Sequence, residues 1–392
     1  MIHPAHAVTP SFADFDARAG RGDALNVVFF GASLTWGANA SDPNLTSYRA
    51  LTGQRLKKRY PKARFTFWDA AIGGTGSQLG VFRLRRDVLR RHPDLVFLDF
   101  SANDGIEVAA PETLASYESL VRRIILEAKC PVVQVIFPFK WNTQSGDTTK
   151  MKRRDAHLHI ARAYNCAVGD AIALSIERIK SGDTTLEKLW PIDGVHPGDT
   201  GYELFADAVW SGFGEAVAEK RACRPPAAML YDDAYMTERR TRFSQIGPLP
   251  EGWKVGIPNR VAAYFDFLMS RWLDDEVIAA PGAARLTARF RGSRVFLLGE
   301  ATPKSGKYRV FIDGKLVEIA REDAAPQSEF DPGAFARNIG GNGHHFQTLA
   351  TDLDPAVEHL IEIEPMLEGE ANELRLESLC VAGDGAAMRM AR

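Results

Sequence analysis

The sequence predicts an α/β domain followed by a smaller all-β domain, and three observations support this. Short β-rich runs alternate with helical periods over residues 25–222, which predicts a parallel sheet with helices on both faces. Period-two alternation starts near residue 260 and is typical of a β-sandwich. Proline, glycine and charged residues are frequent between the two patterns. We therefore predict an α/β domain over 1–222, an irregular connection over 223–260 and a jelly-roll-like β-sandwich over 261–392.

The composition is that of an ordinary globular protein and excludes several functional classes. The chain has 392 residues, which is enough for two domains, with 45% hydrophobic and 25% charged residues. A net charge of −2 provides no basic surface for nucleic acid. No stretch approaches the roughly 20 apolar residues of a membrane span, so we expect no membrane partner.

The N-terminal residues and the cysteines both favour a cytoplasmic protein. The first 20 residues contain neither the charged part nor the apolar part of a signal peptide. The four cysteines, Cys130, Cys166, Cys223 and Cys380, are far apart and have no metal-binding spacing. We therefore expect reduced thiols, no metal site and a cytoplasmic location.

Five short runs are the expected strands of the first domain, and each is too short for a typical helix. They are LNVVFF (25–30), FTFWD (65–69), DLVFLDF (94–100), PVVQVIF (131–137) and CAVGD (166–170). Helical patterns lie between them. After Pro111, apolar residues such as Leu114, Tyr117 and Val121 recur at helical spacing. The last helix is expected over 199–219.

The second domain shows strand and hairpin signals. In KYRVFIDGK (307–315), Tyr308, Val310 and Ile312 share one face, and the Asp-Gly pair at 313–314 is a hairpin signal. Similar runs are LTARF, RVFLLG, HLIEIE and ELRLESLCV. A single helical stretch is expected over 261–272, and we interpret GGNGHHFQ (340–347) as an exposed loop.

Four polar stretches follow predicted strands or precede the last helix. They are GASLT (31–35), AAIGGTGS (70–77), DFSANDG (99–105) and WPIDGVHPGDTGY (190–202). Alone, each is compatible with an ordinary turn. Together they supply a nucleophile, a base, a residue that orients the base, and donors for an oxyanion, at the sheet edge where ligands bind. This combination predicts acyl transfer.

In this order the four stretches resemble the motif blocks of the SGNH hydrolases, also called GDSL esterases and lipases, over about residues 24–215. The resemblance implies a flavodoxin-like, three-layer parallel sheet and neither a metal nor an organic cofactor. It assigns Ser33 as nucleophile, His196 as base and Asp193 as the residue that orients the base. It also implies an oxyanion hole formed by the backbone N–H groups of Ser33 and Gly74 and the amide of Asn103.

The chain departs from the family pattern at two positions and leaves one assignment open. Ala32 replaces the aspartate that precedes the serine, and Ser101 replaces the glycine of the Gly-x-Asn-Asp block. Neither change removes a catalytic group. Gly73 is an alternative to Gly74 as oxyanion donor. We interpret Asp104 as a solvated or structural turn residue.

The expected substrate is a short-chain acyl ester, most simply an acetyl ester, of a small molecule or oligosaccharide. No apolar lid segment is visible beside the blocks, and Trp36, Trp141 and Trp190 are candidates to stack on sugar rings. The second domain resembles modules that accompany some carbohydrate esterases. The alternatives are a lipase or thioesterase, an acyltransferase, and a catalytically degenerate carbohydrate-binding protein. A homo-oligomer also stays open.

Overall fold

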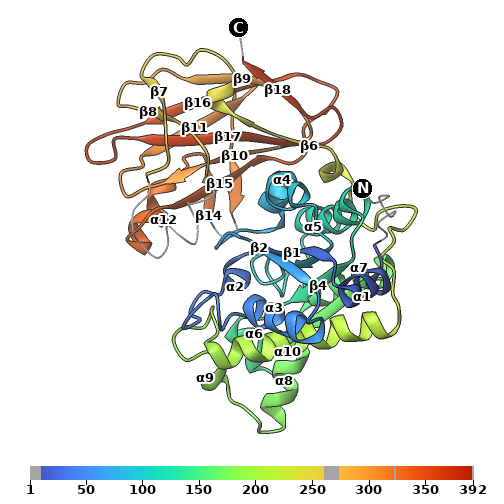
Figure 1. Ribbon diagram of the computed structural model, residues 1–392. Coiled ribbons are helices and arrows are strands. Elements are labelled where there is room, and N and C mark those ends of the chain that lie inside the picture. Colours follow the sequence, from blue (N-terminus) through green and yellow to red (C-terminus); the bar gives the residue numbers. More distant parts are fainter. Residues whose placement is uncertain (1–9, 260–272, 322–323, 391–392) are drawn as a thin grey trace. The chain divides into compact units, whose positions relative to one another are not determined.

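The computed structural model describes residues 10–259, 273–321 and 324–390. It divides the chain into two compact units, residues 1–232 and residues 233–392 (Figure 1). Each unit has its own sheets and is described by itself. The helix expected over 261–272 lies outside the described residues.

The first unit is built on a parallel five-stranded sheet, in agreement with the predicted fold class. The strand order is β2-β1-β3-β4-β5, and every neighbouring pair is parallel. The strands are β1 (Ala24–Gly31), β2 (Arg64–Ala71), β3 (Leu95–Leu98), β4 (Val132–Ile136) and β5 (Ala167–Asp170). This is the flavodoxin-like order, in which ligands bind at the carboxyl ends of the strands near the β1/β3 switch point.

Helices cover both faces of this sheet (Figure 1). The group α1, α3 and α10 packs together, as does the group α4, α5 and α7. The bounds are α1 (Phe12–Arg21), α2 (Ser33–Trp36), α3 (Tyr48–Arg59), α4 (Ser77–Asp87), η1 (Leu89–Arg91), α5 (Pro111–Arg123), η2 (Ile124–Ala128), α6 (Lys140–Gln144), α7 (Lys152–Tyr164), α8 (Ala171–Lys180), α9 (Leu186–Leu189) and α10 (Asp199–Ala218).

The buried run of β1 explains why the sheet forms where it does. Val27, Val28, Phe29 and Phe30 are at most 1% exposed, as expected for a central strand that is covered on both faces. Phe29 stacks on Phe97 of β3, with ring centroids 4.8 Å apart. The strand ends at Gly31, and the chain turns directly into the one-turn helix α2.

The second unit is a β-sandwich of antiparallel sheets. One sheet has the order β15-β10-β17-β8-β7 with β6 on β17, a second has the order β12-β11-β16-β9-β18, and β13 pairs with β14. The strands are β6 (Glu238–Arg242), β7 (Trp253–Gly256), β8 (Glu276–Ala279), β9 (Leu286–Arg291), β10 (Arg294–Ala301), β11 (Lys307–Ile312), β12 (Lys315–Leu316), β13 (Ile319–Arg321), β14 (Ala324–Gln327), β15 (Gly343–Ala350), β16 (His359–Met366), β17 (Leu374–Ala382) and β18 (Ala387–Met390). The helices are η3 (Ala234–Met236), η4 (Phe243–Gln245) and α12 (Pro332–Ile339).

The hairpin signal in KYRVFIDGK leads to the expected structure. Tyr308, Val310 and Ile312 all point into the core. Asp313 and Gly314 have positive φ values of 51° and 76°, which suits the two-residue turn between β11 and β12.

Two segments that we expected to be irregular contain strands of the sandwich. The predicted connection over 223–260 includes β6 and β7. The predicted loop over 340–347 enters β15 at Gly343. The sequence of β6 is ERRTR, and this strand pairs with part of β17 only. Strands β7 and β15 are the outer strands of their sheet. Outer strands do not need the apolar alternation that identifies a covered strand.

Candidate active site

Ser33 lies at the first position of α2, at the carboxyl end of the central strand β1. The turn requires glycine at position 31, because a Cβ there would lie 2.3 Å from Thr35 Oγ1 and 2.7 Å from the carbonyl oxygen of Asp99. The helix ends at Gly37, whose φ of 98° suits a residue without a side chain. The short helix therefore has fixed limits on both sides, and Ser33, 5% exposed, has little freedom.

Ser33, His196 and Asp193 form a chain of hydrogen bonds. The distance from His196 Nε2 to Ser33 Oγ is 3.0 Å, and the distance from His196 Nδ1 to Asp193 Oδ2 is 3.4 Å. Asp193 Oδ1 accepts the backbone N–H groups of Val195 and His196, both at 2.7 Å. The loop before α10 thus folds around its own aspartate, and this turn directs the imidazole towards the serine.

The surroundings favour an ionised Asp193 and a neutral His196. Burial acts to raise the pKa of Asp193, but hydrogen bonds from the His196 backbone, the Asn39 amide and the Val195 backbone outweigh it and lower the pKa. Burial lowers the pKa of His196 and outweighs the attraction of Asp193. A neutral imidazole can accept the serine proton, which is what a general base must do.

Asn39 is a residue of this site that the sequence did not identify. Its amide donates a hydrogen bond of 2.7 Å to Asp193 Oδ2, the oxygen that also faces His196. Its backbone has a φ of 66°, a left-handed conformation that asparagine tolerates. The only signal in the sequence is an asparagine in a small-residue turn, which does not indicate a partner so distant in the chain.

The loop that carries Asn39 is fixed to the start of α10. Asp199 accepts the Ser41 N–H at 2.8 Å, the Ser41 hydroxyl at 2.5 Å and the Thr46 hydroxyl at 2.8 Å. The hydroxyl of Tyr202 donates to the carbonyl of Ala38 at 2.7 Å. These bonds hold the loop after α2 against the segment that follows His196.

Gly74 and Asn103 lie in turns after β2 and β3, at the same carboxyl edge of the sheet as Ser33. Gly74 is exposed with a φ of 72°, whereas Gly73 is buried. Asn103 is exposed. Within the described part of the chain, no acceptor is hydrogen-bonded to the Gly74 N–H or to the Asn103 amide. Their role as oxyanion donors stays a prediction.

Asp104 joins these two turns and is not solvated. Its Oδ1 accepts the Ser77 N–H at 2.9 Å, and it packs where Gly76 has no side chain, since a Cβ there would be 2.4 Å away. Arg153 lies 3.9 Å from its other oxygen. Burial raises the pKa of Asp104 to about 6 despite this cation. Asp104 is therefore a structural residue that connects the glycine turn to the Asn103 turn.

A second buried carboxylate lies beneath the nucleophile, and the sequence did not identify it either. Asp99, 2% exposed, accepts the hydroxyl of Thr35 at 2.9 Å, and Thr35 Oγ1 lies 3.1 Å from the Tyr48 hydroxyl. Burial raises the pKa of Asp99 to about 7. Position 32, where the family has its aspartate, is a fully buried alanine here. The carboxylate next to α2 thus comes from the end of the third strand.

The aromatic candidates differ in exposure. Trp190 is buried, Trp36 is half-buried and Trp141 is 49% exposed. Among the described residues, no group of histidine, cysteine, aspartate or glutamate has the arrangement of a metal site. A search of the same residues for a helix able to cross a membrane finds none.

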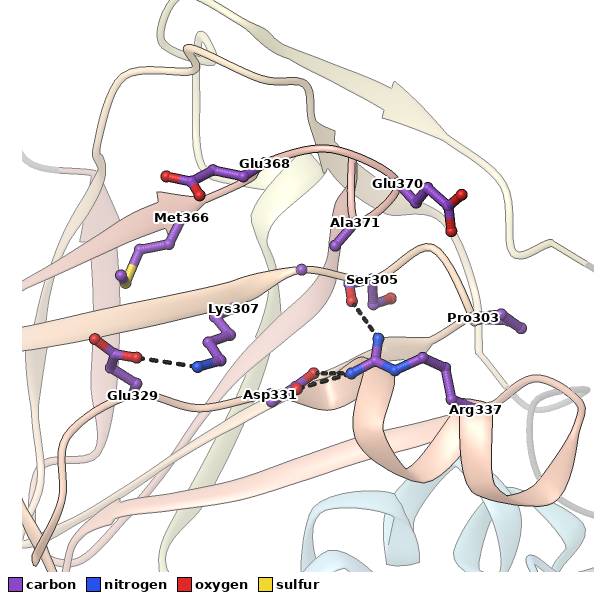
Figure 2. Close-up of a pocket in the computed structure, with 11 residues that line it drawn as sticks. Pro303, Ser305, Lys307, Glu329, Asp331, Arg337, Met366, Glu368, Glu370 and Ala371 are labelled. Carbon is purple, nitrogen blue, oxygen red and sulfur yellow. Dashed lines mark hydrogen bonds and ion pairs between the residues drawn. The ribbon is translucent and has the colours of Figure 1, made fainter.

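A separate cavity of about 470 Å³ lies in the second unit (Figure 2). Its two cations are already paired: Lys307 lies 3.3 Å from Glu329, and Arg337 lies 2.8 Å from Asp331. Its lining residues are Pro303, Ser305, Gly306, Lys307, Glu329, Asp331, Arg337, Met366, Glu368, Glu370 and Ala371. This lining contains no histidine to serve as a base for Ser305, and its one lysine is paired with Glu329, so the cavity does not offer the hydrogen-bonded nucleophile and base found at Ser33.

Comparison with known proteins gives one family match in the first unit and matches to solved structures over both units. Residues 29–204 match the GDSL-like lipase/acylhydrolase family. The chain resembles the structure of a two-domain esterase active on acetylated mannans, co-crystallised with mannopentaose, with 23% identity, 95% of each chain covered and a TM-score of 0.74. A second structure described as a two-domain esterase active on acetylated mannans matches with 22% identity, 95% of each chain covered and a TM-score of 0.72. At this identity the likeness shows the fold of both units. No curated protein sequence matches significantly.

Proposed function

Since the N-terminal unit of this chain belongs to the GDSL-like lipase/acylhydrolase family, and the chain is thus a carboxylic ester hydrolase, we propose that it removes acetyl groups from a carbohydrate such as a mannan. The observation that carries the proposal is the hydrogen-bonded chain of Ser33, His196 and Asp193 at the carboxyl edge of the sheet. The substrate is suggested by the esterase active on acetylated mannans, which has the same two-domain fold.

In the first half of the reaction, Ser33 Oγ attacks the acetyl carbonyl carbon while His196 Nε2 accepts the hydroxyl proton. The carbonyl oxygen becomes an oxyanion. We assign its stabilisation to the backbone N–H groups of Ser33 and Gly74 and to the Asn103 amide. His196 then protonates the sugar oxygen, and the deacetylated sugar leaves an acetyl ester on Ser33.

In the second half, water attacks the acetyl-enzyme. His196 removes a proton from the water, the oxyanion forms again, and its collapse returns the proton to Ser33 Oγ and releases acetate. Asp193 stays ionised throughout and stabilises the imidazolium that forms in each half. Its low pKa, which follows from its backbone and Asn39 hydrogen bonds, suits this role.

An ester series separates this proposal from a lipase or thioesterase. A pocket for long acyl chains would gain up to about 0.8 kcal/mol for each buried CH₂, so kcat/KM would rise from acetate to octanoate. A pocket for acetyl gives the opposite trend. We expect aryl acetate to be the best of the aryl esters, and acetate to be released from acetylated manno-oligosaccharides.

The Ser33→Ala variant is the control for every substrate. Loss of a triad nucleophile costs on the order of 10⁶ in kcat, so turnover should fall below detection. The fold should persist, because alanine fits a helix start after β1. Activity of this variant within tenfold of the parent would contradict the mechanism. A parent protein that binds acetylated sugars without hydrolysing any ester would favour the carbohydrate-binding alternative.

A further inference from the structure

Helix α6 connects two loops of the candidate active site. The backbone N–H of Lys140 donates to the carbonyl of Gly194 at 2.8 Å, and Gly194 lies between Asp193 and His196 in the sequence. At the other side of the helix, the amide of Asn142 donates to Glu107 at 3.2 Å. Glu107 belongs to the loop that begins with the Asn103 turn. One helix is therefore bonded to the loop of the base and to the loop of the oxyanion asparagine.

Trp141 lies on α6 between Lys140 and Asn142, and other residues of the first unit pack against its ring. A Cβ on Gly194 would lie 3.3 Å from the nearest carbon of the Trp141 ring, so the ring packs closely against the backbone of the loop between Asp193 and His196. The ring of Phe139 lies 4.8 Å away at an angle of 41°. Since Trp141 is nevertheless 49% exposed, it is a fixed ring with a large surface open to solvent.

The exposed apolar side chains of the first unit gather at this edge of the sheet. Its large exposed hydrophobic residues, among those described, are Leu45, Val108, Leu126, Trp141, Ile192 and Leu230. Four of them follow the carboxyl end of a strand or precede Asp193: Leu45, Val108, Trp141 and Ile192. The other two lie elsewhere: Leu126 is in η2 before β4, at the amino edge, and Leu230 is in the segment bound to Glu118 of α5. Such a local excess of apolar surface is typical of a binding site.

We propose that Trp141 is a stacking platform for a sugar ring of the substrate, beside the ring whose acetyl group enters the Ser33 site. The C–H groups on one face of a pyranose carry partial positive charge and meet the negative face of the indole, and both surfaces lose water on contact. The proposal rests on the proposed carbohydrate esterase function, and it goes beyond it by naming where the alcohol part binds. The platform takes a neutral sugar ring.

The test compares three variants of Trp141 on two esters. Trp141→Phe keeps a flat aromatic ring, Trp141→Leu keeps an apolar side chain without a flat face, and Trp141→Ala removes both. Leu126→Ala is the matched control, because it truncates a side chain of similar exposure, 47%, at the opposite edge of the sheet. The esters are acetylated manno-oligosaccharides and glyceryl triacetate, which has no ring to stack.

On the acetylated oligosaccharide we expect KM to rise roughly tenfold in Trp141→Ala and Trp141→Leu, with Trp141→Phe close to the parent and kcat little changed. The loss on glyceryl triacetate should be several-fold smaller. The Leu126→Ala variant should match the parent on both esters. Recovery by phenylalanine but not by leucine identifies a flat-ring contact, which a purely structural role of the side chain would not produce.

Three results would overturn the platform. Equal losses on both esters, chiefly in kcat, would mean that Trp141 only supports the His196 loop through Gly194. Leucine as effective as phenylalanine, with a preference for long acyl chains, would make this surface an acyl-binding site. No loss in Trp141→Ala would remove Trp141 from binding. A parent that hydrolyses glyceryl triacetate through Ser33 but no acetylated sugar would overturn the proposed function itself, and the platform with it.

Discussion

At the scale of the residue, His196 is under two opposing influences. Burial disfavours the imidazolium and lowers its pKa, while the charge of Asp193 and the hydrogen bond to it raise the pKa. Burial is the larger influence, so the pKa lies below the usual 6.5. Because the base works in its neutral form, activity should persist to a lower pH than an ordinary histidine would allow.

Asp193→Asn should move the acid limb of the kcat/KM profile to lower pH. The substitution removes a charge that raises the pKa of His196, so that pKa falls further and the neutral form persists to lower pH. The same substitution should reduce kcat by up to about 10⁴, since the aspartate that orients the base and balances its charge is lost. The measurement is kcat/KM from pH 4.5 to pH 8 on an aryl acetate.

Asp199→Asn is the control for this experiment. Asp199 lies six residues from Asp193 and binds Ser41 and Thr46, and it is not among the groups that shift the pKa of His196. Its acid limb should coincide with that of the parent. An acid limb of Asp193→Asn at the parental pH or above it would show that Asp193 does not act on the proton of His196.

At the scale of the element, α10 depends on a close approach to β5. Gly212 of the helix faces the strand so closely that a Cβ would lie 1.8 Å from the carbonyl oxygen of Val168. Gly169 of the strand is also close to the helix, since a Cβ there would lie 2.7 Å from the Val209 Cα. Two glycines thus permit the close contact between α10, which begins directly after the His196 loop, and β5.

Gly212→Ala should destabilise the first unit by about 3 kcal/mol or more, because a backbone carbonyl cannot rotate away as a side chain can. Gly214→Ala is the matched control in the same helix. A Cβ at Gly214 meets nothing within 4 Å, so alanine should stabilise by up to about 1 kcal/mol through its helix propensity. Urea unfolding of both variants measures this difference. Equal stability of the two variants would contradict the packing described for α10 and β5.

The sequence predicted those elements that are buried, because a buried strand needs apolar residues and these are visible in its own sequence. The central strands are continuous apolar runs such as the one over 25–30, and the order of the four blocks placed Ser33, Asp193 and His196 together. The sequence of β6, ERRTR, could not indicate a strand, because it has no apolar alternation and its partners, such as Glu377 of β17 for Arg240, are distant in the sequence.

Contacts between distant residues were also beyond the reach of local patterns. The hydrogen bond of Asn39 to Asp193 spans 154 positions, and that of Thr35 to Asp99 spans 64. Asp99 had a weaker signal, since a carboxylate interrupts the apolar run DLVFLDF. A carboxylate in such a run indicates either the end of a strand or a buried side chain with a polar partner. The fold shows both for Asp99, which follows the end of β3 and accepts a hydrogen bond from Thr35.

At the scale of the whole molecule, each unit encloses its own hydrophobic core. In the second unit the buried side chains of both sheets form one cluster, which includes Val310, Ile361 and Leu379. In the first unit the last residues before the second unit are bound to a buried side chain. Glu118, fully buried, accepts the N–H groups of Leu230 and Tyr231, each at 2.8 Å. Separate cores give each unit its own source of folding free energy.

We therefore expect two thermal transitions that single substitutions move independently. Gly212→Ala should lower the transition of the first unit only. Ile361→Ala, in the centre of β16 and 0% exposed, removes about 2–5 kcal/mol from the second core and should lower only the other transition. For units of this size each kcal/mol corresponds to a shift of roughly 2–4 °C, so calorimetry can resolve both effects. A single transition lowered by both variants would contradict this expectation and would mean that the two units unfold as one cooperative body. Loss of stability in the sandwich would then also remove Ser33-dependent activity.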